Sequence, residues 1–117
     1  MSLTDRIARG LESGWKVTDG AQLTESLTTE ADVVVIGTGA GGGTTAEILA
    51  SSGLSVILVE EGRLYYQKDF KMDEQTSYAN LYQEGMSRVT RDGAIAILQG
   101  RCVGGSTTVN WTSSFRT

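Results

Sequence analysis

This sequence of 117 residues contains no histidine or proline and only one cysteine. It contains no histidine, which is the commonest general base and the commonest metal ligand of proteins, so no metal site is expected. It contains no proline, and its single cysteine, Cys102, excludes an internal disulfide framework. No apolar run approaches the roughly 20 residues that span a bilayer, so no transmembrane segment is expected.

Charge excludes two further classes of partner. The formal net charge is −4, and no run of basic residues is present. Neither nucleic acid nor an anionic membrane surface is therefore an expected partner. The first residues, Met-Ser-Leu-Thr-Asp-Arg, lack the apolar core of a signal peptide, so the expected location is cytoplasmic.

The most informative stretch that is present begins at Asp32. Residues Val33–Ile36 form a short β-branched apolar run, which predicts a strand buried on both faces. Gly37, Gly39 and Gly42 follow in the spacing G-x-G-x-x-G. In this pattern the first glycine permits a tight turn, the second lets a pyrophosphate approach the backbone, and the third lets a helix pack against the sheet. The pattern predicts a phosphate-binding turn.

The residues after the turn complete a βαβ pattern. A helix is predicted over about Ala40–Ser52, ended by Gly53, and a second buried strand over Val56–Val59. Glu60 follows that strand, with seventeen residues between it and Gly42, where the acid that binds a ribose diol is expected. A carboxylate here would repel an adenosine 2′-phosphate, which disfavours NADP. The pattern does not distinguish NAD from FAD. A βαβ unit with a glycine-rich turn and no ligand is the alternative interpretation.

The flanking segments give weaker predictions. The first 30 residues are expected to form an arm with a short helix near residues 3–11, packed on a neighbouring region through Trp15. A substrate lid is the alternative. Residues Asp73–Glu84 are predicted to be a helix capped by Asp73, stopped at Gly85, with Ala79 and Leu81 pointing inward. The Asp92-Gly93 pair predicts a hairpin between residues 87–91 and 94–98.

A second glycine cluster follows the hairpin. Its sequence is Gly-Arg-Cys-Val-Gly-Gly-Ser-Thr-Thr-Val-Asn, from Gly100 to Asn110. Adjacent glycines followed by hydroxyl residues let a backbone run close to a flat or anionic ligand. A tight loop without a ligand is the alternative. Cys102, beside Arg101, is either a small buried filler or a reactive thiol whose pKa that cation lowers.

Taken in order, these motifs resemble the glucose–methanol–choline oxidoreductases, a family of FAD-dependent alcohol-oxidising enzymes. The matches are residues 37–42, the strand ending Glu-Glu-Gly at 60–62, and residues 100–110, which fit the family's pattern G-[RK]-x-x-G-G-[ST]-[ST]-x-x-N. The form of the first match is similar to choline-dehydrogenase-like and long-chain-alcohol-oxidase-like members. The resemblance spans Asp32 to Asn110, and residues 1–30 add little to it.

The resemblance implies FAD as the cofactor and a small-molecule alcohol as the substrate. The FAD would be held without a covalent bond, because relatives that attach it covalently use a histidine and this sequence has none. The pyrophosphate would lie at the first glycine turn and the adenosine ribose at Glu60, while the second glycine cluster would lie along the flavin and its ribityl chain. The implied cofactor-binding residues are Gly37, Thr38, Gly39, Ala40, Gly41, Gly42, Glu60, Glu61, Arg101, Gly104, Gly105, Ser106 and Asn110.

The expected fold class is α/β, an incomplete Rossmann-like βαβ FAD-binding domain with an inserted helix and β-hairpin. Residues 1–30 would be the arm, and residues 31–117 the N-terminal part of that domain, truncated before its remainder and before a substrate domain. No catalytic residue is assigned, because the family's His-His or His-Asn pair lies near the C-terminal end of its members. The 117 residues alone are therefore expected to be inactive. The electron acceptor stays unassigned, and an NAD-binding or other adenine-nucleotide module without redox chemistry is the alternative function.

Overall fold

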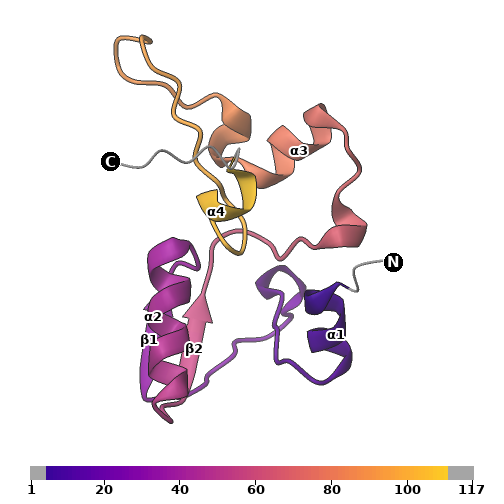
Figure 1. Ribbon diagram of the computed structural model, residues 1–117, viewed down its shortest axis with the longest axis vertical. Helices are drawn as coiled ribbons and strands as arrows, with labels where there is room; N and C mark the ends of the chain where they lie inside the picture. Colours follow the sequence, from indigo (N-terminus) through magenta and orange to yellow (C-terminus); the bar gives the residue numbers. More distant parts are fainter. Residues whose placement is uncertain (1–4, 111–117) are drawn as a thin grey trace.

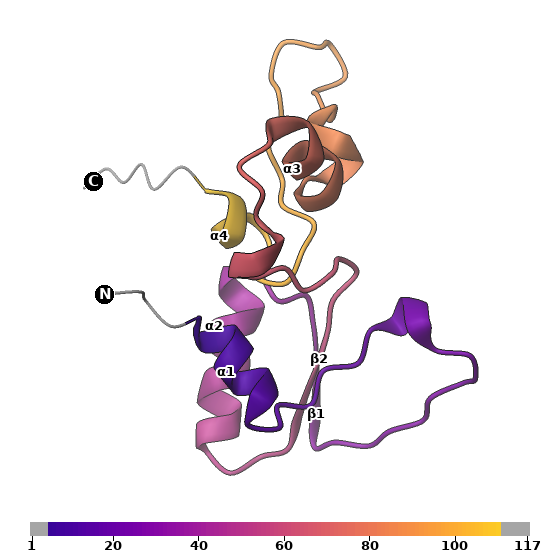
Figure 2. The same ribbon diagram turned by 90° about the vertical axis from the view of Figure 1, so that its right-hand side faces the viewer.

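A computed structural model describes residues 5–110 of the chain. A strand, a helix and a second strand form its βαβ unit: β1 (Val33–Ile36), α2 (Ala40–Ser51) and β2 (Val56–Val59). The two strands are parallel, with Val33 opposite Val56 and Ile36 opposite Val59. Figure 1 shows this unit at the lower left, and Figure 2 shows α2 along one side of the strands. The predicted strands are confirmed, and the predicted helix is one residue shorter than expected.

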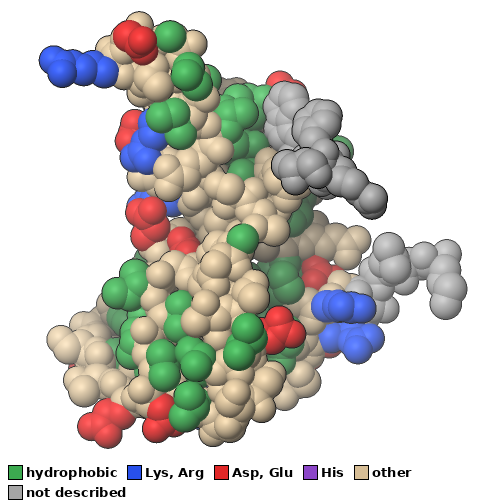
Figure 3. Space-filling view, turned by 60° about the vertical axis from the view of Figure 1, so that its left-hand side comes forward, with side chains coloured by type: hydrophobic (Ala, Val, Ile, Leu, Met, Phe, Trp, Pro, Cys, Tyr) green, Lys and Arg blue, Asp and Glu red, His purple; other side chains and the backbone are tan. Residues whose placement is uncertain are grey.

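The two strands are not buried on both faces, so that part of the prediction is wrong. Val35 faces α2, because a Cβ added to Gly42 of that helix would lie 3.4 Å from Val35 Cγ1. Val34 and Ile36 point to the opposite face and are 56% and 87% exposed. Both strands are apolar at every position, as is typical of a parallel sheet with helices on both faces. Here α2 covers only one face of the sheet. Hydrophobic side chains consequently reach the surface in this part of the molecule (Figure 3).

The described part of the N-terminal arm contains α1 (Arg6–Glu12). The short helix predicted near residues 3–11 is thus confirmed over residues 6–11, and residues 3 and 4 lie outside the described range. Asp5 caps α1 by accepting from the Ile7 and Ala8 amides. Trp15 packs against Gly10 of α1 and stays 58% exposed, so it does not anchor the arm to another region as expected. Gly10 has no side chain, which leaves room for the indole ring inside the arm itself.

Polar contacts fasten the arm to the segment after β2. The second carboxylate oxygen of Asp5 accepts from the Gln67 amide at 2.9 Å, where a short 3₁₀ helix, η2 (Gln67–Asp69), begins. Asp19, which caps the 3₁₀ helix η1 (Gly20–Gln22), forms an ion pair with Arg63 at 3.2 Å. Both contacts are exposed to solvent, so each contributes little to the stability of the fold.

A helix, α3 (Glu74–Leu81), follows, and its N-terminus was predicted correctly. Asp73 caps it by accepting from the Thr76 amide at 2.8 Å. The helix ends three residues before Glu84, because Tyr82 is extended and forms a bridge with Gly100. The chain then turns through η3 (Gln83–Met86).

Of the two α3 residues predicted to point inward, one does so. Leu81 is buried, whereas Ala79 is exposed, so the inward orientation of Ala79 is wrong. Residues two positions apart on an α-helix point to nearly opposite sides, so Ala79 and Leu81 cannot both face the core. No helix between residues 5 and 110 is long and apolar enough to cross a membrane.

The predicted hairpin forms in the expected register but with little pairing. Val89 bridges Ala96, and the Thr90 amide donates to Ile95 O at 2.9 Å. Gly93 closes the turn by donating to Thr90 O at 2.8 Å. Figure 1 shows this hairpin projecting at the top of the molecule.

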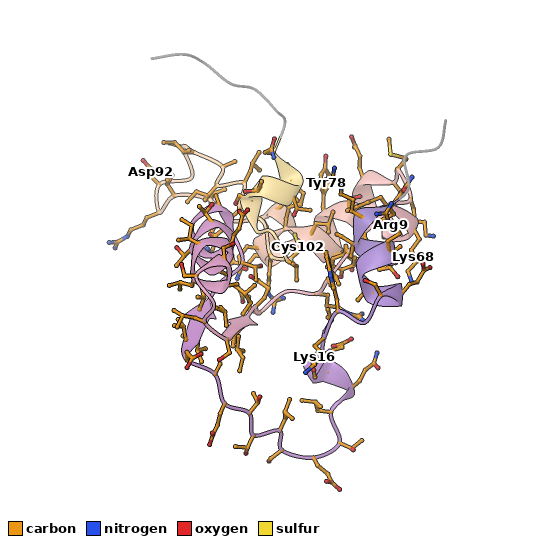
Figure 4. All side chains as sticks on the ribbon, turned by 60° about the horizontal axis from the view of Figure 1, so that its bottom comes forward. Arg9, Lys16, Lys68, Tyr78, Asp92 and Cys102 are labelled. Carbon is orange, nitrogen blue, oxygen red and sulfur yellow. The ribbon has the colours of Figure 1, made fainter. Side chains whose placement is uncertain are left out.

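The second glycine segment returns from the hairpin to the βαβ unit and is held on both sides. On one side the Val103 amide donates to Arg63 O at 3.0 Å, and on the other the Arg101 amide donates to Leu81 O at 2.7 Å. Cys102 lies between these contacts, fully buried, near the centre of Figure 4. The chain then enters the short helix α4 (Ser106–Val109). This pairing brings the second glycine segment beside the first.

Candidate nucleotide-binding site

A cavity of about 600 Å³ lies between the two glycine segments. Its lining comes from the carboxyl ends of both strands, the first glycine turn, the residues after β2, and the second glycine segment. These residues are Ile36, Gly37, Thr38, Gly39, Ala40, Val59, Glu60, Glu61, Gln99, Gly100, Gly105, Ser106 and Thr107. The carboxyl edge of a parallel sheet is where α/β proteins bind their ligands.

The first glycine turn presents the start of α2 to this cavity. Gly39 is the N-cap residue and offers no side-chain oxygen to the helix, whose first turn also lacks an acidic residue. The first N–H groups of a helix have no partner within the helix, and the helix dipole favours an anion beside them. A Cβ added to Gly39 would meet nothing within 4 Å, so the space in front of this turn is open.

Glu60 accepts three hydrogen bonds, two of them from Thr38 in the same turn. Its Oε2 accepts from the Thr38 amide at 2.9 Å and from the Thr38 hydroxyl at 2.7 Å, and its Oε1 accepts from the Gly62 amide at 3.0 Å. Partial burial raises the pKa of the Glu60 carboxyl, but the hydrogen bonds from Thr38 and Gly62 outweigh it and hold that pKa below its usual value. Glu60 is therefore ionised at neutral pH, at the edge of the cavity.

The second glycine segment closes on the first at two points. The Gly104 amide donates to the Thr38 hydroxyl at 3.0 Å. Gly105 approaches Gly39 so closely that a Cβ added to Gly105 would lie 3.1 Å from Gly39 Cα. Gly105 also has a φ of +55°, a conformation that L side chains rarely adopt. The two signatures, which 57 residues separate in the sequence, thus form adjoining walls of one cavity.

The structure brings eight of the thirteen predicted site residues to the cavity lining. Gly41, Gly42 and Gly104 are not among the lining residues. Arg101 directs its guanidinium to Glu61 at 3.2 Å, in an ion pair whose side chains are both more than half exposed. Asn110 lines a separate cavity of about 280 Å³ and donates to Thr107 O.

Comparisons with known proteins identify the family of the chain. The family model "GMC oxidoreductase" matches residues 78–117, which include the second glycine segment. The long-chain-alcohol oxidase FAO1 of Arabidopsis thaliana is 37% identical over 109 residues, 93% of this chain and 14% of that protein. The chain belongs to the GMC oxidoreductase family.

Further GMC relatives cover the same region. The long-chain-alcohol oxidase FAO4B of Arabidopsis thaliana is 43% identical over 86 residues, 74% of this chain and 12% of that protein. An uncharacterised GMC-type oxidoreductase of Mycobacterium tuberculosis is 41% identical over 90 residues, 75% of this chain and 14% of that protein. The chain thus spans about 14% of the length of such relatives. No solved structure matches the chain.

Five lining residues of this GMC chain were not among the predicted site residues. Gly100 and Thr107 lie inside the second glycine motif, so the motif itself was a sufficient signal for them. Ile36 and Val59 end the two strands, and the rule that ligands bind at the carboxyl ends of parallel strands could have found them. Nothing in the sequence singles out Gln99.

Cys102 is not among the residues that line the cavity. Its side chain is fully buried, and burial raises the pKa of its thiol. The neighbouring Arg101 turns to Glu61, so it does not stabilise a thiolate. The prediction of a buried filler is confirmed. Within residues 5–110 no three acidic or cysteine side chains gather in a way that could hold a metal ion.

Proposed function

We propose that this chain is the N-terminal FAD-binding portion of a flavin-dependent oxidoreductase that oxidises the CH–OH group of an alcohol by hydride transfer to FAD. The observation that carries the proposal is the cavity between the two glycine segments. Membership of the GMC family supports it, as do relatives named as long-chain-alcohol oxidases. A Rossmann-like domain is the fold that this proposal requires.

The residues present fit the parts of FAD. The open space before Gly39 and the uncapped start of α2 suit a pyrophosphate, since no side chain fills the approach. The ionised Glu60 can accept hydrogen bonds from ribose hydroxyls, because each carboxylate oxygen has more than one acceptor site. Gly105 and Ser106 give the opposite wall a backbone surface suited to a flat ring.

The role of this chain is to bind and orient the cofactor. When bound, FAD supplies the acceptor for the hydride that leaves the alcohol carbon. The sequence has no histidine, so we propose that FAD is held without a covalent bond and that the group removing the alcohol proton lies in the rest of a longer protein. The substrate would be a long-chain alcohol, as the names of the relatives suggest.

The alternative is a module that binds NAD or another adenine nucleotide without redox chemistry. The first glycine turn and Glu60 suit any dinucleotide with a free ribose diol. The second wall at Gly105 and Ser106 distinguishes the two proposals, because an isoalloxazine ring needs such a surface beyond the ribose and pyrophosphate.

Identification of the bound nucleotide tests the proposal. The complete protein that contains this chain should release FAD on denaturation, in a ratio of one per chain, and its flavin should be bleached by a long-chain alcohol without oxygen. Release of NAD, or failure of the apoprotein to take up FAD, would overturn it.

A further inference from the structure

We propose that Thr38 is a positioning residue whose hydroxyl couples the two glycine segments and thereby sets the flavin side of the cavity. The inference rests on the proposed FAD site. It assigns Thr38 a role different from direct contact with the cofactor. The Thr38 hydroxyl bonds both to the Glu60 carboxylate and to the backbone of the second glycine segment. Among the hydrogen bonds of residues 5–110, no other group makes this link.

The direction of both hydrogen bonds follows from their partners. Glu60 is ionised and can only accept, so the Thr38 hydroxyl must donate its proton to Oε2 at 2.7 Å. The Gly104 amide can only donate, so the same hydroxyl must accept at 3.0 Å. A hydroxyl satisfies both at once, and a methyl group satisfies neither. Donation to the carboxylate polarises the hydroxyl and makes its oxygen a better acceptor for Gly104.

The link acts on the second segment more than on the first. Without the Thr38 hydroxyl, Glu60 keeps two backbone donors, the amides of Thr38 and Gly62. The Gly104 amide would lose the Thr38 hydroxyl as its acceptor and, being only partly buried, would turn to water. The second glycine segment would keep its backbone hydrogen bonds to Arg63 and Leu81. Among the described residues, however, no hydrogen bond would then join the wall at Gly105 to the first segment.

The cavity side that this link controls is the side assigned to the flavin. Gly105 and Ser106 follow Gly104 directly and line the cavity opposite the first turn. Loss of the Thr38 hydroxyl should therefore impair a ligand that reaches this wall and spare one that occupies only the pyrophosphate and ribose positions. FAD and ADP are such a pair, since ADP lacks the flavin and its ribityl chain.

The test measures the Kd of FAD and of ADP in the apo form of the complete protein for the wild type, Thr38→Val and Thr38→Ser. Thr45→Val serves as the matched control, because Thr45 lies exposed on α2. Thr38→Val should weaken FAD about tenfold, the effect of losing one charge-assisted network, and ADP less than about threefold. Thr38→Ser should restore both affinities and the visible circular dichroism of bound flavin, and Thr45→Val should leave them unchanged.

The outcomes separate this inference from the proposed function. If the wild type binds FAD and Thr38→Val weakens FAD and ADP equally, or if serine fails to restore FAD binding, the positioning role is wrong and the FAD site stands. If the wild type does not bind FAD, the proposed function fails and the inference fails with it. Should Thr38→Val lower the yield of folded protein, Thr38→Ala beside Thr38→Ser provides the same comparison with a smaller side chain.

Discussion

The two glycine segments of this molecule reach one cavity by different means. The first, Gly37–Gly42, lies at a strand-to-helix junction, and its shape follows from its immediate neighbours in the chain. The second owes its place to backbone pairing with Arg63 and Leu81, which precede it by many residues. A local turn can be recognised from spacing alone, whereas a turn held by tertiary pairing depends on segments that no local pattern identifies.

The segments also differ chemically. The first combines free helix N–H groups with the ionised Glu60, which suits phosphates and ribose hydroxyls. The second presents glycine backbone and hydroxyl groups, and its one cation, Arg101, is engaged with Glu61. This contrast is why we assign the charged part of the dinucleotide to the first segment and the flat ring to the second.

Breaking the tertiary support of the second segment should have the largest effect. A Cβ at Gly62 would lie 2.4 to 2.5 Å from three backbone atoms of Arg101 and Cys102. These atoms belong to one peptide group, so they cannot move away independently of each other. Gly62→Ala should therefore destabilise the complete protein by about 3 kcal/mol, the upper end for overpacking. Chemical denaturation measures this, with Gly20→Ala as control, because a Cβ there meets open space. Equal stability of the two variants would contradict the account.

Removing the carboxylate tests the first segment as a ligand site. Glu60→Ala should weaken FAD roughly ten- to a hundredfold, since charge-assisted hydrogen bonds contribute about 1.5–3 kcal/mol. Titration of the apo complete protein with FAD measures the change. An unchanged Kd would remove Glu60 from the site.

Two adjacent glycines of α2 test how closely the helix must approach the turn. A Cβ at Gly42 would lie 1.9 Å from Gly37 O, whereas the nearest atom to a Cβ at Gly43 is Thr38 O at 3.7 Å. Gly42→Ala should cost about 1–2 kcal/mol, because a single carbonyl can tilt away in part. Gly43→Ala should stabilise by roughly 0.5–1 kcal/mol through helix propensity. Thermal unfolding of both variants checks the pair, and similar values would contradict it.

The smallest expected effect is on pH dependence. The pKa of Glu60 is lowered in the folded state from its ordinary value of 4.5, so its ionised form stabilises the fold. This stability is present above pH 4.5 and is lost as the pH falls through the lowered folded pKa. Glu60→Gln should remove that part of the acid sensitivity. The difference in unfolding free energy between wild type and variant should therefore shrink below pH 4.5, and a constant difference would contradict the assignment.

Much of the βαβ unit could be predicted from the sequence, because its strands, glycine spacing and Glu60 form one local pattern. The open sheet face could not, since Val34 and Ile36 are as apolar as residues of a strand covered on both sides. The early end of α3 could not be predicted either, because it results from the pairing of Tyr82 with Gly100. The same holds for Trp15, whose position depends on the space left by Gly10.

The two simultaneous hydrogen bonds of the Thr38 hydroxyl could not be predicted from the sequence either. Both its partners, Glu60 and Gly104, belonged to recognised motifs, but only the fold shows that one hydroxyl meets them both. Asn110 matched the second motif and yet lies at a different cavity. Motif membership thus identified the segments of the site and not the position of every residue within them.

The central claim is that one FAD bridges both glycine segments, and paired titrations with FAD and ADP test it most directly. A Cβ at Gly39 would meet nothing within 4 Å, so Gly39→Val places a branched side chain in the space assigned to the pyrophosphate and should abolish binding of both nucleotides. Gly105→Val, at a φ of +55° in the second wall, should abolish FAD binding and retain ADP, while Ala94→Val in the hairpin should change neither. If Gly105→Val binds FAD as tightly as the wild type, the second segment is only a structural turn and the claim is wrong.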